Sequence, residues 1–443
     1  MEQSGHAAVL FWGWELTSAF AHDTMKWNMI KCFRREGLTE MNREENTKVR
    51  KGGRKARNES GLAKPFSVLK RIGFIMLIAV GVLLGIFIIL LGVLGVCRMV
   101  NGSHYRIDTP DGIQEDAYVE IGGIEQFMQI RGEDKNNPVV LWLHGGPGFP
   151  LTYMNWYYQG ELEKDYTVAC LEQRGCGRTY YKNDKNNKAA NASPDELLSD
   201  IHEAVEYLKK RFHKDKVILM AQSWGTVIGM KYTEQHPENV AAYVGVGQVT
   251  QFAKGKLYSA QKAADLAERQ GNTRDAERLR ELAAAFEKVT DIENVSIKDL
   301  EEMILTSGKY LKSEGEMSGM KQMTTALTSP HFNLNDARWF LFASDTKNII
   351  DSQTELIDYM YFGFDLNEIR LPENVPVLFV QGDCDYITPT DMVKAYCASA
   401  NSDTVRMVTI PDAGHTPFLD NPAAFCETVK GAAFAEGNDT VKD

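Results

Sequence analysis

The spacing of apolar and polar residues divides the chain into a polar N-terminal part, one long apolar run, and a region where short apolar segments alternate with amphipathic ones. The apolar run, Ile72 to Cys97, contains 26 uncharged and nearly all apolar residues. As a helix it would extend roughly 39 Å, more than the roughly 30 Å hydrocarbon core of a bilayer. Residues 72–97 are therefore predicted to form a transmembrane helix.

The charges around this run predict its orientation. Residues 1–71 carry an excess of basic side chains and are predicted to be a disordered cytoplasmic segment. Within it, residues 1–40 show no period and suggest an extension from an early start codon. In the predicted linker, 98–116, two arginines lie among acidic residues. The positive-inside rule then places everything after residue 98 outside the cytoplasm.

From residue 117 onward, segments of strand length alternate with helical patterns. The predicted strands are Ala117–Ile121, Ile124–Ile130, Val139–Leu143, Thr167–Leu171, Val217–Ala221, Ala241–Val246, Val377–Val380 and Arg406–Ile410. The clearest helix follows the N-cap Ser193 and ends near Phe212, with Pro194 at its first position. This alternation predicts an α/β fold with a mostly parallel sheet and helices on both faces, built by residues 117–250 and 372–443.

The alternation stops between residues 251 and 371. This stretch is rich in Ala, Glu, Lys, Arg and Leu, and its pattern predicts helices. Because it lies between two strands of one predicted sheet, it is an insertion. Its position above the strand ends predicts a helical lid over a site.

Composition narrows the possible functions. A net charge of −11 does not suit a nucleic-acid-binding protein. The seven cysteines form no C-x-x-C pair and no Cys/His cluster, which argues against a zinc site and a disulfide framework. We expect no metal or cofactor. The oligomeric state and the redox state of the cysteines stay open.

One strand–turn–helix segment, VILMAQSWGT at 217–226, places Ser223 at its tip. It is a G-x-S-x-G arrangement with Ala221 in the first glycine position and Gly225 in the second. Small residues are needed there because strand and helix approach closely at a strained turn. A buried strand end with a capping serine would have the same residues, so the other loops must decide.

Three other loops follow predicted strands. The glycines of HGGPG at 144–148 let backbone N–H groups face a cavity, as an oxyanion hole requires, although a simple tight turn would look the same. Asp383 and Asp385 follow one strand, and His415 follows the last. The order serine, aspartate, histidine is that of α/β-hydrolases.

Together with the serine segment, these loops resemble the proline iminopeptidase (prolyl aminopeptidase) branch of the α/β-hydrolases over roughly residues 117–432. The motifs are HGGPG at 144–148, EQRGCGRT at 172–179, SWG at 223–225, GDCD at 382–385 and GH at 414–415. The resemblance implies that Ser223 is the nucleophile, His415 the general base and acid, and Asp385 the partner of the histidine. It also implies an oxyanion hole from the backbone N–H groups of Gly146 and Trp224, and a site braced by Gln173 and Arg174.

Some positions depart from the family pattern. Glu172 replaces the usual Asp, Thr179 the usual Ser, and Ala221-Gln222 the usual Gly-Gly. The family's aminopeptidases hold the substrate amine with lid glutamates, and here the substrate-binding residues cannot be assigned. The candidates are Glu281, Glu287, Glu293, Glu301 and Glu302.

Three functions follow from these observations. The primary interpretation is a membrane-anchored aminopeptidase that releases N-terminal residues from short peptides outside the cytoplasm. The alternative is an esterase or amidase on the same scaffold. A buried lid carboxylate near Ser223 would favour the first, and an apolar lid pocket the second. A non-catalytic binding domain is disfavoured by the intact residue set, and a serine at position 223 argues against epoxide hydrolase or dehalogenase chemistry.

Overall fold

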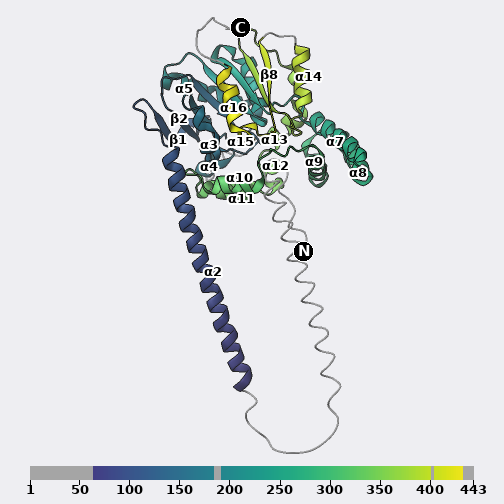
Figure 1. Ribbon diagram of the computed structural model, residues 1–443. Helices are drawn as coiled ribbons and strands as arrows, with labels where there is room; N and C mark the ends of the chain where they lie inside the picture. Colours follow the sequence, from purple (N-terminus) through teal and green to yellow (C-terminus); the bar gives the residue numbers. More distant parts are fainter. Residues whose placement is uncertain (1–62, 184–190, 401–403, 433–443) are drawn as a thin grey trace, which may run out of the picture.

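A computed structural model describes residues 63–183, 191–400 and 404–432 (Figure 1). Its centre is an eight-stranded sheet in the order β1-β2-β4-β3-β5-β6-β7-β8. The strands are β1 Ile113–Ile121, β2 Ile124–Gly132, β3 Val139–Leu143, β4 Thr167–Leu171, β5 Val217–Gln222, β6 Val240–Val246, β7 Val377–Gly382 and β8 Val405–Ile410. Only the β1–β2 and β2–β4 pairs of this described sheet are antiparallel. The predicted mostly parallel sheet is therefore confirmed.

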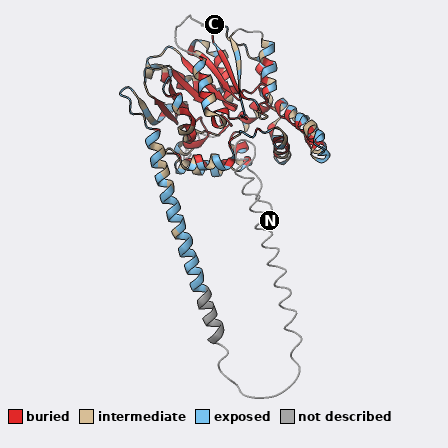
Figure 2. Ribbon diagram, in the orientation of Figure 1, coloured by how far each residue is buried: buried red, intermediate tan, exposed pale blue. Residues whose placement is uncertain are grey.

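Helices cover both faces of the sheet. Outside the region between β6 and β7 they are α3 Asn155–Tyr158, α4 Gly177–Asn183, α5 Pro194–Phe212, α6 Trp224–Gln235, α14 Thr390–Ala400, α15 Pro417–Asp420 and α16 Pro422–Gly431. The buried apolar residues form two core clusters. Successive residues of one strand belong to different clusters: Leu219 packs in one and Met220 in the other. Figure 2 shows the buried residues concentrated on the sheet and its flanking helices. As predicted, α5 begins at Ser193, whose hydroxyl accepts a hydrogen bond from Glu196 N at 3.2 Å.

The chain between β6 and β7 is helical where the lid was predicted. It contains α7 Phe252–Arg269, α8 Thr273–Phe286, α9 Ile297–Leu311, α10 Gly319–Leu327, α11 Leu334–Ala343, α12 Thr346–Ser352 and α13 Thr354–Asp358. A buried ion pair fastens this region to the core: the guanidinium of Arg178 donates to both carboxylate oxygens of Asp336, each at 2.8 Å.

A long helix, α2 Ala63–His104, precedes the sheet and extends away from the domain (Figure 1). From Gly73 to His104 it is long and apolar enough to cross a membrane, and its most apolar stretch of 18 residues has a mean hydropathy of 3.2. It extends past the predicted limit of Cys97 because its polar end packs on the domain. Arg98 Nε donates to Leu327 O at 2.7 Å, and Asn101 Nδ2 donates to Thr328 O at 2.9 Å.

Helix α2 also begins at Ala63, nine residues before the predicted start at Ile72, so residues 63–71, which were predicted to belong to a disordered segment, are helical. The remaining predicted limits differ less. Strand β1 starts at Ile113, four residues before the predicted Ala117, so the connection after α2 is shorter than the predicted linker. Its early part alternates half-buried and exposed residues at the sheet edge, which weakens the sequence signal. The predictions for residues 1–62 lie outside the described residues.

Candidate active site

Ser223 occupies a strained turn between β5 and α6. Its φ of 52° lies in the left-handed region, where a non-glycine residue is uncommon. The turn requires a close approach of helix and strand: a Cβ added to Gly225 would lie 2.5 Å from Leu143 O and 2.8 Å from His144 O. Position 225 therefore accepts only glycine.

His415 and Asp385 lie in contact at the ends of β8 and β7. The distance from His415 Nδ1 to Asp385 Oδ2 is 3.0 Å. The other oxygen, Asp385 Oδ1, accepts hydrogen bonds from the backbone N–H groups of Ile387 and Thr388, both at 2.9 Å. The Thr388 hydroxyl donates to Asp385 Oδ2 at 2.6 Å. The carboxylate is thus held in one orientation toward the imidazole.

The balance of forces keeps Asp385 ionised. Burial alone would raise the pKa of this carboxyl. The charge of His415 and the hydrogen bonds from His415 and Thr388 together outweigh burial, so the pKa lies below its ordinary value. An ionised Asp385 accepts the Nδ1 proton of His415 and leaves Nε2 as the basic nitrogen.

The strand ends bring His415 near Ser223. Ser223 N donates to Val246 O at 2.9 Å, and the next residue, Gly247, packs against the imidazole. A Cβ at Gly247 would lie 3.0 Å from His415 Cε1. Within the described residues the His415 ring bonds to Asp385 and Thr388 and not to Ser223. Such contacts often tighten only when substrate binds.

The loop after β3 lies beside Ser223. A Cβ at Gly145 would lie 3.1 Å from Ser223 Cβ and 2.1 Å from Gln222 Oε1, so the bulk of Gln222 is accommodated by the glycine opposite. Gly146 has a φ of 124°, a conformation suited to glycine. Trp224 is the first residue of α6, where a backbone N–H has no partner within the helix.

Gln173 connects this loop to the serine turn. Its Nε2 donates to His144 O at 3.2 Å, and its Oε1 accepts from the Trp224 indole at 3.1 Å. Its backbone N–H donates to His144 Nε2 at 3.1 Å. Because burial lowers the pKa of His144 to about 4, this ring is neutral, and Nδ1 donates to Gly145 O at 2.8 Å.

Thr179 and Glu172, two residues that depart from the family pattern, both form hydrogen bonds in the site. The Thr179 hydroxyl donates to Glu172 O at 2.6 Å and accepts from Phe127 N at 2.8 Å, as a serine hydroxyl could. The Glu172 carboxylate accepts from Arg178 N at 2.6 Å and from the Thr152 hydroxyl. Arg174 donates to both oxygens of the buried Asp200, each at 2.8 Å.

Comparison with known proteins identifies the family of the fold. Residues 138–422 match the family described as the alpha/beta hydrolase fold. The chain belongs to this family.

The relatives of this α/β-hydrolase include enzymes of different names. It is 26% identical over 311 residues to the probable aminopeptidase YbaC of Bacillus subtilis (strain 168), covering 70% of this chain and 93% of that protein. It is 25% identical over 125 residues to proline iminopeptidase of Neisseria gonorrhoeae, covering 27% and 37%. Epoxide hydrolase 1 of Caenorhabditis elegans is 34% identical over 115 residues, covering 26% and 25%. The predicted resemblance to proline iminopeptidases is confirmed.

The five glutamates proposed from sequence take different positions in this α/β-hydrolase. Glu281, Glu287 and Glu293 are exposed, and Glu302 pairs with Arg278 at 2.8 Å. Glu301 is buried and accepts from the Thr346 hydroxyl at 2.8 Å, which is a contact between two lid helices. None of the contacts described for these glutamates involves Ser223 or His415.

A different lid glutamate, Glu316, lies next to the histidine loop. A Cβ at Gly414 would lie 2.4 Å from Glu316 Cδ, so this carboxyl packs on the backbone just before His415. Burial raises the pKa of Glu316 to about 7. Asp420 accepts from the neighbouring Met317 N at 2.8 Å and Gly414 N at 2.9 Å. In the sequence, the only indication that Glu316 could belong to the site was its place in a turn of the predicted lid.

A buried lysine of the lid also lies near Asp385. Lys256 Nζ donates to Ile387 O at 3.2 Å, and burial lowers the pKa of Lys256 to about 7 against the opposing attraction of Asp385. The described cysteines are free. The described residues contain no group of three His, Cys, Asp or Glu side chains able to hold a metal.

Replacing Gln173 by leucine should lower kcat/KM for an aryl ester by roughly 100-fold, because a displacement of about 1 Å at a reacting centre can cost that much. The side chain would no longer bond the His144 carbonyl and the Trp224 indole. The measurement is steady-state hydrolysis by the purified full chain. Gln270→Leu, on an exposed part of the lid, is the matched control. Equal activity of the two variants would refute the bracing role.

Proposed function

We propose that this protein is a serine hydrolase that acts by acyl transfer. The observation that supports this best is the convergence of the ends of four strands, β3, β5, β7 and β8. They bring together Ser223 in its left-handed turn, the bonded pair of His415 and Asp385, and the glycine loop at 144–148. Four chemically suitable features at one edge of a sheet are what acyl transfer requires.

In the proposed reaction, Ser223 Oγ attacks the substrate carbonyl while His415 Nε2 takes the hydroxyl proton. Asp385 holds the imidazole tautomer and stabilises the imidazolium. The backbone N–H groups of Gly146 and Trp224 stabilise the oxyanion, and the loss of one such donor costs about 3–4 kcal/mol. His415 then protonates the leaving group, and water hydrolyses the acyl-enzyme by the reverse sequence of proton transfers.

The substrate class that we propose is a short peptide with a free N-terminus. The relative that this chain matches over most of its length is named a probable aminopeptidase. Glu316 offers a carboxyl beside the histidine loop, and a substrate ammonium nearby would favour its ionised form. Whether proline is the preferred N-terminal residue is not part of this proposal.

One observation favours the second candidate, an esterase or amidase that accepts an apolar acyl group. A pocket of about 300 Å³ lies between α10, α11 and the loop after β3, and most of its lining is apolar. Its size falls at the lower end of the range for small-molecule sites.

Replacing Ser223 by alanine should abolish labelling by a fluorophosphonate probe and hydrolysis of aryl esters, because the nucleophile would be absent. Gel fluorescence of the labelled full chain measures the first, and absorbance of the released phenol the second. Ser399→Ala, at an exposed position of α14 where the serine hydroxyl donates to Tyr396 O, serves as the control. A Ser223→Ala protein that still labels would show that another residue is the nucleophile.

Replacing Glu316 by glutamine should lower kcat/KM for alanyl- and prolyl-arylamides by about 10-fold or more, since one ion pair to the amine is lost. Aryl ester hydrolysis should change little. Glu287→Gln, at an exposed lid position, is the matched control. Equal losses on arylamides and esters would assign Glu316 a structural role. If the wild-type protein hydrolysed aryl esters but not arylamides, the result would favour the second candidate.

We also propose that α2 anchors the enzyme with its N-terminus in the cytoplasm and its hydrolase domain, including the lid insertion 251–371, outside. The basic residues before the apolar run support this orientation. Protease added to intact cells should therefore remove the domain after residue 98, as detected with a C-terminal tag. Full protection of the tag, with cleavage after lysis, would reverse the orientation.

A further inference from the structure

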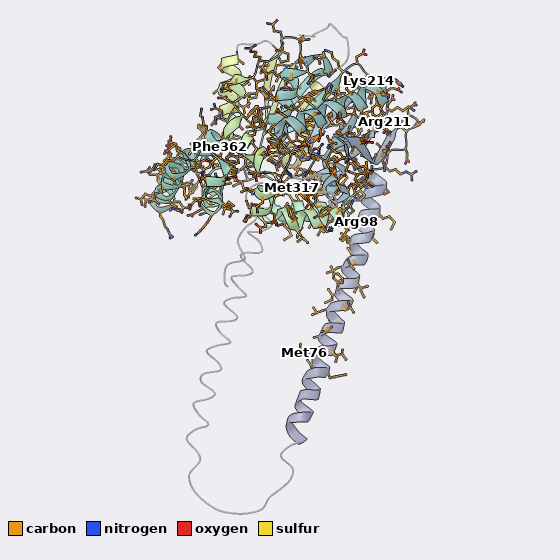
Figure 3. The ribbon with its side chains drawn as sticks, turned by 180° about the vertical axis from the view of Figure 1, so that it is seen from behind. Met76, Arg98, Arg211, Lys214, Met317 and Phe362 are labelled. Carbon is orange, nitrogen blue, oxygen red and sulfur yellow. The ribbon has the colours of Figure 1, made fainter. Side chains whose placement is uncertain are left out.

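The junction between α2 and the domain determines which side of the domain faces a membrane. The polar end of α2 bonds to the end of α10 through Arg98 and Asn101. A Cβ at Gly102 would lie 3.3 Å from Pro330 Cβ. Figure 3 shows Arg98 where the helix meets the domain, with Met76 far along the projecting helix. Helices α10 and α11 lie at the same end of the domain (Figure 1).

The exposed apolar side chains of the domain gather on these two helices. Outside α2, eight large apolar residues of the described chain are exposed, and five of them belong to α10 or α11. The five are Met320, Leu327, Leu334, Phe340 and Leu341. Leu334 and Leu341 are 74% and 72% exposed. Such a concentration on one surface indicates a contact with an apolar partner.

The charges on these helices suit a lipid surface. Helix α10 contains no carboxylate, and the sole carboxylate of α11, Asp336, is buried against Arg178. The exposed cations are Lys321 and Arg338. Apolar side chains flanked by cations without exposed anions are typical of helices that lie on anionic bilayers.

The apolar pocket opens on this same surface. Its walls include Leu151 and Met154 from the loop after β3, Met323 and Leu327 from α10, and Trp339 and Phe340 from α11. Three of its polar side chains are already engaged: Gln322 Nε2 donates to Met317 O, Ser344 Oγ donates to Phe340 O, and Asp336 binds Arg178. A ligand would therefore be recognised by its apolar surface.

The inner wall of the pocket is joined to the candidate active site. The Trp339 indole donates to Gly148 O at 2.7 Å, in the loop that contains Gly146. Phe149 and Pro150, which follow this loop, also line the pocket. An occupant of the pocket would thus lie one residue layer from the glycine loop.

We propose that the surface formed by α10 and α11 rests on the bilayer beside α2, and that the pocket in this surface receives an acyl chain of a membrane lipid. The continuity of the surface with α2 selects the bilayer as the partner. The predominantly apolar lining selects the chain over the headgroup. This proposal requires the anchor described above but does not depend on the proposed reaction.

The contact with the bilayer can be tested by photocrosslinking of the full chain in vesicles of phosphatidylcholine and phosphatidylglycerol. Benzoylphenylalanine is placed singly at Leu334, Leu341, Leu84 in α2, or Val408 on β8, all of which are exposed. We expect lipid adducts at 334, 341 and 84 and none at 408. Adducts at 84 alone, or crosslinks from 334 and 341 to a second copy, would refute the contact while leaving the anchor intact. No adduct at 84 would refute both.

Occupancy of the pocket is tested with a phosphatidylcholine that carries a diazirine near the end of one acyl chain. Peptide mapping should locate adducts on pocket residues, and Ala337→Trp or Ala326→Trp, which fill the pocket from α11 and α10, should reduce them about 10-fold. Ala285→Trp, on the exposed part of α8, should not. Ser223→Ala should label normally, which separates pocket occupancy from an acyl-enzyme. Equal labelling of all variants would refute the lipid site.

Discussion

The close approach of α6 to the end of β3 is the constraint on which the candidate site depends. Gly225 lies so near Leu143 O and His144 O that no side chain fits between them. This approach forces Ser223 into the left-handed region, and it sets the serine beside Gly145. The same turn makes Trp224 the first residue of a helix, with a backbone N–H directed outward. One packing contact between glycine and backbone therefore positions both the proposed nucleophile and the proposed oxyanion donors.

The helical lid is fastened to three of the four loops of the site, those after β3, β7 and β8. Trp339 bonds the loop after β3, Ser259 Oγ donates to Tyr386 O at 2.7 Å beside Asp385, and Met317 N donates to Asp420 after His415. The pair of Arg178 and Asp336 joins lid and core without solvent, and removal of one partner from such a pair costs about 3–5 kcal/mol. Lid residues thus shape the loops that would carry the chemistry as well as the space above them.

The sequence predicted what depends on local periodicity and not what depends on distant packing. The strands and the serine turn were predicted because buried parallel strands are short apolar runs and because the turn needs small residues. Glu316 was missed because a glutamate in a polar turn looks solvated, and its burial comes from Gly414, far along the chain. The end of α2 was placed too early because charge marks a membrane boundary but does not end a helix that can dock on the domain. The bracing role of Gln173 was implied only by family resemblance.

The position of the proposed anchor, α2, bears on the choice between the two candidate substrates. The helices that meet α2 also form the apolar pocket, and Trp339 of that pocket bonds the glycine loop. Glu316, in contrast, lies at the histidine side of the site. A substrate with a cationic end and an apolar end would find a complementary group at each of these two places. Since peptide and ester chemistry would share the proposed nucleophile and oxyanion donors, we expect these two surfaces, and not the proposed catalytic residues, to set which acyl compounds are accepted.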